Sequence, residues 1–585
     1  MSGETGMSAS EAATATPTGT PADGVAGGGA PAVRVRNLVV GFGAPGADPV
    51  LNGVTFEVAP GECLAIVGES GSGKSVTART LLGLAGDHAC VRADELSLAG
   101  ADVRGLSEQG WRRRRGRDVG LVLQDALVSL DPLRPVGREI ADSLRLHTSL
   151  GAAARHARVL ELLDRVGLPD AGNSVRKRSG ELSGGQRQRA LIAAAIALDP
   201  PLLIADEPTT ALDVTVQAQI LELLASLKRA GTGILLISHD LAVVGRLADR
   251  IAVMSEGRIV EQGPAHEMLT RPEHPVTRQM LAAIPVDKPR GLRLSPRGAA
   301  PVSPALVSPA LPAPDRMDRG APPVTVLEAT GLVKRFTRPD GSEQLAVDGV
   351  SFRLERGTTL GIVGESGSGK TTTARLALAL TRPDAGEVRV LGQPFSSATE
   401  RQRRRLRPQI GAVYQDALSS FDPRLSVEQV LRDAVGGGSS TGRGGASGSA
   451  PDRLQVLQLL DAVGLAQGLL GRRPLSLSGG QRQRVSIARA LASGPQILIC
   501  DEPVSSLDVT VQAQVLDLLD ELQRDRGLSL LFISHDLGVI QHVSDQVAVM
   551  LGGRIVETGA AARVFAAPEH PYTQALLGAV PRIGC

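Results

Sequence analysis

The sequence predicts an α/β fold that is built twice along the chain. Three short aliphatic runs end in polar residues (LAIVG, PLLIADE and GILLISHD), which is typical of buried parallel strands. Helical patterns lie between them, and one apolar stripe runs through Val159, Leu162, Leu163 and Val166 before Gly167 stops it. Strands and helices that alternate in this way predict a parallel sheet with helices on both faces.

The second observation is a long internal repeat. The chain has 585 residues, and GESGSGK recurs after 296 residues, from Lys74 to Lys370. LSGGQRQR recurs after 295 residues, from Ser183 to Ser478, and the DEP and ISHD runs return in the same order. Because order and spacing are both kept, the chain is predicted to contain two copies of one domain.

The composition along the chain predicts where these domains begin and end. We expect a disordered tail over residues 1–31, a first domain over 32–285, a Pro/Ala/Ser-rich linker over 286–323 and a second domain over 324–585. The tail lacks the basic start and apolar stretch of a signal peptide. A Gly/Ser-rich stretch at 436–451 is predicted to be a flexible loop within the second domain.

The overall composition argues against several classes of protein. There are 63 Lys and Arg against 61 Asp and Glu, and a net charge of +2 is unlike that of proteins that coat nucleic acid. Four single cysteines give no support for a zinc ribbon or a disulfide framework. No apolar run is long enough to span a bilayer, so a membrane role would be played from outside it. Two arginine-rich runs, WRRRRGR and RQRRRLR, are interpreted as solvated helix faces.

The strongest functional signal is the octamer GESGSGKS, which returns as GESGSGKT. It follows an apolar strand and opens a helix, so its backbone amides are expected to wrap phosphate groups. Lys74 and Lys370 would reach the β- and γ-phosphates, and the hydroxyls of Ser75 and Thr371 would bind Mg²⁺. The alternatives are a structural glycine turn or a dinucleotide site, which the repetition in one context disfavours.

A second strand in each copy ends in a pair of acids. The first acid, Asp206 or Asp501, would face Mg²⁺, and the second, Glu207 or Glu502, would polarise an attacking water. The alternative is a strand end with two solvated acids, but both pairs follow a phosphate loop upstream in the chain.

Two further motifs recur. His239 and His535 follow the next strand in ISHD, and although a lone histidine is usually structural, this one returns at the same offset. LSGGQ places a serine and two glycines at the start of a helical pattern, which predicts a second phosphate-binding helix end in each copy. The alternative for LSGGQ is an ordinary glycine N-cap.

These motifs, taken in order, resemble the ABC-type ATPases over residues 33–285 and 324–581. The resemblance implies two tandem P-loop NTPase domains, each with a RecA-like core and a helical subdomain. It also implies a head-to-tail sandwich, in which the P-loop of one copy faces LSGGQ of the other across a shared ATP. The expected pairs are Lys74 with Ser478 and Gly480, and Lys370 with Ser183 and Gly185.

The resemblance assigns roles to further residues. Gln124 and Gln415 would sense Mg²⁺ and the attacking water. Loops at Asp213 and Asp508 would cross the interface between the copies. The candidates for stacking on adenine, with a core role as the alternative, are Phe42 and Phe336.

The candidate site residues form three groups. The catalytic candidates are Glu207, Glu502, His239, His535, Gln124 and Gln415. The nucleotide-binding candidates are Gly68, Glu69, Ser70, Gly71, Ser72, Gly73, Lys74, Ser75 and Val76; Gly364, Glu365, Ser366, Gly367, Ser368, Gly369, Lys370, Thr371 and Thr372; Ser183, Gly184, Gly185 and Gln186; Ser478, Gly479, Gly480 and Gln481; and Phe42 and Phe336. The Mg²⁺ candidates are Ser75, Gln124, Asp206, Thr371, Gln415 and Asp501.

Two features resemble the peptide/nickel importer branch of this family. DALVSLDP and DALSSFDP follow the two glutamines, with Ala126 and Ala417 where that branch usually has proline. Segments with PEHPVT and PEHPYT lie near the end of each copy. No cysteine cluster follows these segments, so no iron–sulfur cluster is expected. The fused arrangement resembles ATP-binding subunits for dipeptide, oligopeptide or glutathione uptake.

The sequence therefore predicts an ATPase that uses ATP and Mg²⁺ at two competent sites to drive solute import. The expected partners are two membrane permeases and, through them, an extracytoplasmic solute-binding protein; no nucleic acid is expected. The expected location is the cytoplasmic face of the cell membrane, as a peripheral protein. One alternative is a soluble twin ATPase acting on ribosomes or DNA, and another is a nucleotide-binding scaffold without turnover.

Overall fold

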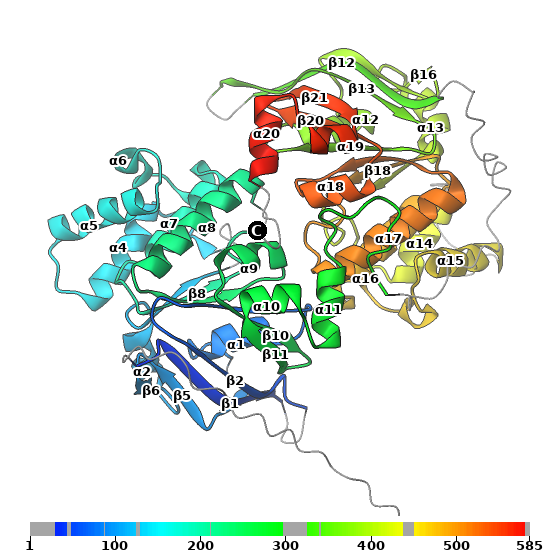
Figure 1. Cartoon of the computed structure of the whole chain (residues 1–585). Helices are drawn as coiled ribbons and strands as arrows, with labels where there is room; N and C mark the ends of the chain where they lie inside the picture. The colour runs from blue at the N-terminus through cyan, green and yellow to red at the C-terminus, as the bar shows by residue number, and fades with distance from the viewer. Residues whose placement is uncertain are drawn as a thin grey trace, which may run out of the picture.

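The computed structural model describes eight stretches of the chain. They are residues 30–43, 48–86, 88–123, 129–210, 212–296, 324–337, 341–436 and 450–579. Two lobes are formed, the first from the amino-terminal copy and the second from the carboxyl-terminal copy (Figure 1). Gln124, most of the expected tail, residues 297–323 of the expected linker and nearly all of the expected 436–451 loop lie outside these stretches.

A six-stranded sheet forms the centre of the first lobe. Its order is β11-β10-β3-β9-β8-β7, in which all neighbours are parallel except the edge strand β11. The strands are β3 (Cys63–Gly68), β7 (Val119–Val122), β8 (Leu202–Asp206), β9 (Gly233–Ile237), β10 (Arg250–Ser255) and β11 (Arg258–Pro264). Because β3, β9 and β8 are adjacent and parallel, the motifs that follow them meet at one edge of the sheet.

The second lobe repeats this sheet, which confirms the predicted α/β fold with parallel strands. The order is β17-β18-β19-β14-β20-β21, with only β21 antiparallel. The strands are β14 (Thr359–Gly364), β17 (Ile410–Val413), β18 (Ile497–Asp501), β19 (Ser529–Ile533), β20 (Gln546–Leu551) and β21 (Arg554–Ala560).

An antiparallel sheet covers one side of each central sheet and was not predicted. It contains β1 (Val33–Phe42), β2 (Leu51–Val58), β4 (Ala89–Arg92), β5 (Glu95–Leu98) and β6 (Ala101–Asp102) in the first lobe, and β12 (Thr325–Thr337), β13 (Glu343–Glu355), β15 (Ala385–Val390) and β16 (Gln393–Pro394) in the second. Strand β3 shows how two cores form around the central sheet. Leu64 and Ile66 pack in the core shared with the antiparallel sheet, whereas Ala65 and Val67 pack in the core under the helices.

Helices also cover the other side of each central sheet. A separate group of them lies around each LSGGQ and includes the helix that begins within it. This group contains α4 (Val136–His147), α5 (Ala152–Arg165), α6 (Ala171–Ser174) and α7 (Gly184–Ala195), and in the second lobe α14 (Val427–Val435), α15 (Ala450–Ala462) and α16 (Gly479–Leu491). The predicted apolar stripe lies on α5, where Val159, Leu162 and Leu163 are buried. The remaining helices are α1 (Lys74–Thr80), α2 (Glu108–Arg114), α8 (Val214–Arg229), α9 (Leu241–Leu247), α10 (Ala265–Thr270), α11 (Pro275–Ala282), α12 (Lys370–Ala377), α13 (Glu400–Leu406), α17 (Val509–Arg526), α18 (Leu537–Val543), α19 (Ala561–Ala566) and α20 (Pro571–Gly578).

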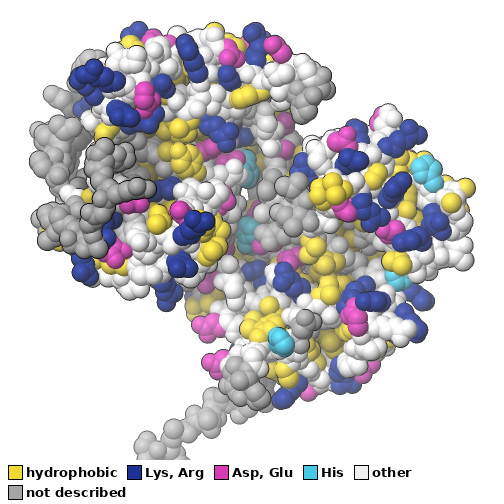
Figure 2. All heavy atoms as spheres, turned by 180° about the vertical axis from the view of Figure 1, so that it is seen from behind, with side chains coloured by type: hydrophobic (Ala, Val, Ile, Leu, Met, Phe, Trp, Pro, Cys, Tyr) yellow, Lys and Arg dark blue, Asp and Glu magenta, His cyan; other side chains and the backbone are white. Residues whose placement is uncertain are grey.

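The two arginine-rich runs lie largely on α2 and α13 and are partly paired with acids on the same helices. Arg112 lies 3.3 Å from Glu108, and Arg403 lies 3.7 Å from Glu400. Seen from behind, Lys and Arg side chains are spread over both lobes among acidic ones, with no continuous basic patch on that face (Figure 2). Within the described stretches, none of the helices combines the length and apolar character that crossing a membrane requires.

The start of the expected linker is a packed segment. Residues 286–296, called the clasp segment below, follow α11 and lie against α17 and α18 of the second lobe. The backbone amides of Leu294 and Ser295 donate to the two carboxylate oxygens of the buried Asp517, at 2.9 and 2.8 Å. Arg293 donates to Glu521 at 2.6 Å. The first lobe is therefore joined to the second by specific hydrogen bonds, where sequence composition had indicated a spacer.

The clasp segment also supplies a cation that the second lobe lacks. In the first lobe, Lys228 of α8 pairs with Asp249 at 2.9 Å. At the equivalent position α17 has Gln523, and the ion pair with Asp545 is made by Arg290 of the clasp segment, which also donates to Gln523 at 2.6 Å. The second lobe thus completes a charged contact with a side chain that precedes it in the chain.

Candidate functional site

The P-loop lysines are held by their own loops. Lys74 Nζ donates to the carbonyls of Gly68 and Glu69 at 2.7 and 2.8 Å, and Lys370 makes the equivalent two bonds at 2.7 Å. An ammonium group has three donors, so one remains for a phosphate oxygen. Burial lowers the pKa of both lysines, and the neighbouring carboxylates oppose this effect.

Two glycines show why the loop needs this residue type. A Cβ atom on Gly68 would lie 2.1 Å from the carbonyl oxygen of Met254, which is backbone and cannot move aside. Gly73 caps α1 with a left-handed φ of 106°, a conformation that other residues rarely adopt. The tight turn that results presents backbone amides at the start of α1, as anion binding requires.

The first acid of each pair lies beside the P-loop hydroxyl. Thr371 Oγ1 donates to Asp501 Oδ1 at 3.2 Å. Burial raises the pKa of Asp501, with the charge of Glu502 acting in the same direction and the Thr371 hydrogen bond against it. A carboxylate and a hydroxyl with open space in front of them are oxygen ligands of the kind that Mg²⁺ takes together with nucleotide phosphates. The residues therefore fit the predicted ion.

The second acid of each pair is bound to the predicted histidine. Glu207 Oε1 lies 3.0 Å from His239 Nδ1, and Glu502 Oε1 lies 3.1 Å from His535 Nδ1. Both glutamates have a left-handed φ of 49°, a strained conformation that is found most often at functional sites. The structure thus brings together the two acid–histidine sets that the sequence predicted from separate strands.

Pairing outweighs burial in setting the charge of these groups. Burial alone would raise the pKa of Glu207, but the hydrogen bond and charge of His239 bring it below its ordinary value. Burial alone would lower the pKa of His239, but Glu207 brings it above its ordinary value. Both groups are therefore charged at pH values between the lowered pKa of Glu207 and the raised pKa of His239. In this range Glu207 is a carboxylate that is able to accept a proton.

We expect Glu207→Gln to lower the pKa of His239, because burial then acts on the imidazole without its carboxylate partner. In the wild-type chain the imidazolium should persist above the ordinary histidine pKa and be lost as pH rises through the raised value, together with the pair's contribution to stability. An NMR titration with labelled histidine would measure this, with the resonance assigned by His239→Gln. Glu222→Gln, which changes an exposed glutamate, should leave the titration unchanged. An unaltered pKa in Glu207→Gln would contradict the pairing.

Of the two glutamines predicted to act beside the acids, only Gln415 is described. Its Nε2 donates to Glu502 Oε2 at 2.8 Å, so it lies where it can orient a water near that carboxylate. Gln124 lies outside the described residues.

In each copy the LSGGQ serine, and not a glycine, caps the helix that follows it; the two LSGGQ segments are called the signatures below. Ser183 Oγ accepts the Gln186 amide at 3.3 Å, and Gln186 Oε1 accepts the Ser183 amide at 3.0 Å. Ser478 and Gln481 form the same reciprocal pair at 3.3 and 3.1 Å. This capping box orients the serine and leaves its hydroxyl proton available to a ligand.

Each P-loop opens into a pocket that both copies line. The first pocket, of about 390 Å³, joins Lys74 and Glu207 to Asp508 of the second copy. The second pocket, of about 670 Å³, joins Lys370 to Asp213 of the first copy. Direct bonds cross the same interface: the Ser70 amide donates to Asp508 Oδ2 at 3.3 Å, and Thr215 Oγ1 donates to Glu365 Oε1 at 3.1 Å.

The opposing signatures lie behind these interface loops. Among the described residues that line the two pockets there is no member of either LSGGQ. Gly479 is packed toward Leu507, and Leu507 in turn lines the first pocket. The expected pairing of Lys74 with Ser478 is therefore absent from the lining in this arrangement, where Asp508 of the second copy lines the pocket with Lys74.

The two candidates for adenine stacking differ. Phe336 lines the second pocket, where Lys334 lies 5.6 Å from its ring centroid. Phe42 is exposed at the end of β1 and is not among the described lining residues of the first pocket.

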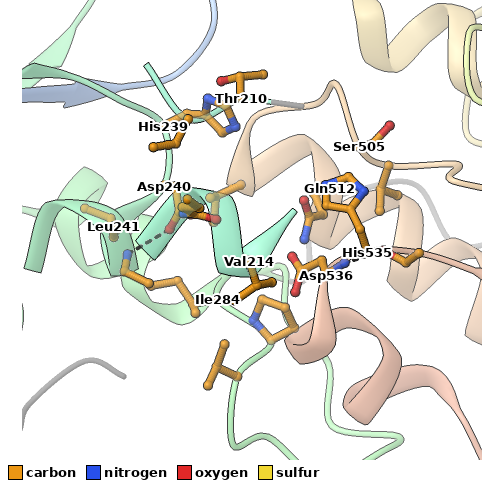
Figure 3. A pocket seen from close by; sticks show the side chains of 18 of the residues that line it. Thr210, Val214, His239, Asp240, Leu241, Ile284, Ser505, Gln512, His535 and Asp536 are labelled. Carbon is orange, nitrogen blue, oxygen red and sulfur yellow. Dashed lines mark hydrogen bonds between the residues drawn. The ribbon is translucent and has the colours of Figure 1, made fainter. Parts of the chain in front are cut away.

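A small central pocket of about 150 Å³ lies between the two P-loop pockets (Figure 3). His239 and His535 border it from the two copies, and Asp240 and Asp536 lie on opposite sides of it. Burial raises the pKa of Asp536, and the charge of Asp240 adds to this effect. Seen from behind, the molecule is hollowed between the lobes, with histidine and acidic side chains inside the hollow (Figure 2).

Sequence reasoning missed three residues that contact the acids or the second P-loop. Thr210 Oγ1 donates to Glu207 Oε2 at 3.0 Å, Thr215 bridges the copies, and Tyr572 contacts the second P-loop. Thr210 and Thr215 belong to a block that recurs in both copies, which was a usable signal. The contact of Tyr572 spans 207 residues, so motif spacing could not reveal it.

Two family models match the chain. One, described as ABC transporter, matches residues 51–210 and 347–505. The other, described as Oligopeptide/dipeptide transporter, C-terminal region, matches residues 260–305 and 556–585. Each model therefore matches once in each copy.

The chain is also similar to three transport proteins over most of their length. It is 41% identical to an oligopeptide transport ATP-binding protein of Mycobacterium tuberculosis, over 94% of this chain and 98% of that one. It is 42% identical to a peptidoglycan transport ATP-binding protein of Agrobacterium fabrum, over 94% and 96% of the two chains. It is 42% identical to a glutathione import ATP-binding protein of Pectobacterium atrosepticum, over 94% and 89%.

Proposed function

This chain belongs to the ABC transporter family, and from this premise we propose that it is the ATP-hydrolysing subunit of an importer for peptide-like solutes. The observation that carries the proposal is the bonded pair of glutamate and histidine beside a P-loop in each copy. The printed names of its relatives, which concern oligopeptide, peptidoglycan and glutathione transport, support the solute class.

The match of the oligopeptide/dipeptide transporter region in both copies favours this function over a soluble ATPase that acts on ribosomes or DNA. The two complete acid–histidine sets also disfavour a scaffold without turnover.

Hydrolysis would proceed by attack of water on the γ-phosphate. Glu207 and Glu502 are ionised and would accept the water's proton, while Gln415 would orient the water at Glu502. Lys74 and Lys370 would use their remaining donor to neutralise charge on the phosphates. The imidazolium of each partner histidine would keep its glutamate oriented and charged.

Magnesium would be held at each site by the P-loop hydroxyl and the first acid, Ser75 with Asp206 and Thr371 with Asp501. When bound it would neutralise charge on the β- and γ-phosphates. Since the protein supplies few ligands of its own, the ion is expected to arrive with the nucleotide.

Closure of the two copies would make hydrolysis conditional on their geometry. The Asp508 and Asp213 loops already contact the opposite P-loops, and a further approach would bring the capped serines Ser478 and Ser183 toward the phosphates. The pocket lining is consistent with an open arrangement that ATP would close.

The permeases would dock where the loop that holds Gln124 or Gln415 meets the group of helices around LSGGQ. In the second copy a groove of about 790 Å³ lies there, lined by Gln415, Asp416, Ser419 and Ser420. Arg489 orders one wall of it by donating to the Ser420 carbonyl and hydroxyl at 2.5 and 2.9 Å. We place the chain at the cytoplasmic face of the membrane, with a solute-binding protein on the other side of the permeases.

Affinity purification of the full chain from native membranes tests this function. We expect two permeases to co-purify and the complex in proteoliposomes to take up peptides when ATP is supplied. The double variant Glu207→Gln with Glu502→Gln should still co-purify with the permeases but support no uptake. Recovery of ribosomes or DNA in place of permeases would overturn the proposal.

A further inference from the structure

The two P-loops differ in one contact that comes from the end of the second copy. The amide of Glu365, the first residue after β14, donates to the hydroxyl of Tyr572 at 3.0 Å. Tyr572 lies on α20, in the PEHPYT segment. The equivalent residue in PEHPVT is Val276, on α11, whose side chain has no polar atom and cannot make this bond.

The backbone on which Tyr572 lies is firmly placed. His570 caps α20 by accepting the Tyr572 amide on Nδ1 at 3.1 Å, and Glu557 of β21 accepts the amides of Glu569 and His570 at 2.9 and 3.1 Å. In the first copy Glu261 and His274 hold α11 in a similar way, by accepting the amides of Glu273 and Val276. The PEHPVT and PEHPYT segments are therefore held by equivalent hydrogen bonds, and they differ in the phenol of Tyr572.

Glu365 is contacted on three sides. Its amide donates to Tyr572, its carbonyl accepts from Lys370 at 2.7 Å, and its carboxylate accepts from Thr215 of the first copy at 3.1 Å. Thr215 Oγ1 also lies 2.7 Å from Asp213 Oδ1, which caps α8 at the interface. The single hydroxyl proton of Thr215 is shared between these two carboxylates. Polar contacts thus join the C-terminal helix, the second P-loop and the interface loop of the first copy.

The phenol of Tyr572 stays neutral over the physiological pH range. Burial, with the charges of Glu365 and Asp213 adding to it, raises the pKa of Tyr572 to about 12. The neutral phenol accepts the Glu365 amide, and its ring packs against an apolar cluster that includes Val214 of the first copy.

We propose that Tyr572 is a positioning residue of the second ATP site, which ties α20 to the P-loop and to the opposing interface loop, and that the two ATP sites are inequivalent because the first has Val276. The inference rests on the proposed ATP hydrolysis. Tyr572 acts through Glu365 and not on ATP, so its loss should loosen the P-loop against the first copy more than it weakens capture of the nucleotide.

The test compares Tyr572→Phe with the matched variant Val276→Thr in the full chain bound to its permeases. We expect Tyr572→Phe to lower kcat for ATP hydrolysis about three- to tenfold, the effect of one lost hydrogen bond, with KM for ATP within about twofold. Amide hydrogen exchange should become faster in the peptide spanning 357–370 and stay unchanged in the peptide spanning 61–74. Tyr572→Val should lower kcat at least as much as Tyr572→Phe, because it also removes the packing of the ring, and Val276→Thr should change none of these quantities.

An unchanged kcat in Tyr572→Phe, or equal acceleration of exchange in both P-loop peptides, would overturn the inference. The double variant Glu207→Gln with Glu502→Gln separates this failure from that of the proposed function. If that variant is inactive while Tyr572→Phe is normal, only the positioning role fails. If the double variant hydrolyses ATP at the wild-type rate, the proposed chemistry fails.

Discussion

Replacing both Glu207 and Glu502 by Gln is expected to lower steady-state ATP hydrolysis by about 10²- to 10⁴-fold, the usual contribution of a general base. Glutamine has the size of glutamate but cannot accept the water's proton. Each carboxylate is the partner of a histidine at 3.0 or 3.1 Å, so each single substitution should also lower turnover measurably. Phosphate release at saturating ATP measures the effect.

The matched control for these variants is Glu222→Gln on the surface of α8. Glu222 pairs only with the exposed Arg229 among the interactions described for it, and its side chain is 68% exposed. This variant should hydrolyse ATP at the wild-type rate. If one of the two site variants leaves the rate untouched, that site is idle in the wild-type chain, which contradicts the expectation that both turn over.

Replacing Asp517 by Ala is expected to destabilise the second lobe by about 2–4 kcal/mol, because two backbone amides and a serine hydroxyl lose their acceptor. Asp517 is only 6% exposed, and the amide of Leu294 that it accepts is buried. Release of the clasp segment would also remove Arg290 from Asp545. Urea unfolding that is monitored by hydrogen exchange in peptides from α17 and from α8 measures the loss of stability in each lobe.

Glu222→Ala is the matched control for this variant, since Glu222 is the residue of α8 that corresponds to Asp517 of α17. It should change stability by less than about 0.5 kcal/mol, as is usual for exposed positions. Equal unfolding midpoints for Asp517→Ala and Glu222→Ala would show that residues 286–296 behave as the spacer that composition predicts.

Local sequence was sufficient for the residues that carry chemistry. The P-loops, the acid pairs and the histidines each follow a buried strand, and the strands β3, β8 and β9 are neighbours in one parallel sheet. Their side chains therefore meet wherever the strands pair, as Glu207 and His239 do. The glycines of the P-loop are equally local, because their need comes from the turn itself.

Composition did not predict the contacts that depend on tertiary packing. The clasp segment contains two prolines and two arginines among its eleven residues, yet it binds α17 through Arg290 and Gln523, which are separated by 233 residues. The antiparallel sheets were also missed, since no motif marks their strands and β1 pairs with β4 and β5 across β3, the P-loop and α1.

By itself the sequence determined that two copies of one ATPase domain follow each other, and which acids, lysines and histidines each copy offers. Only the tertiary structure decided how the copies meet. The interface loops at Asp213 and Asp508, and not the signatures, line the opposite P-loop pockets. Tyr572 contacts the P-loop of the second copy, and its counterpart Val276 cannot make the same bond. The physical reason is distance along the chain. A motif acts through backbone geometry within a few residues, whereas these contacts depend on how the two lobes are placed relative to each other.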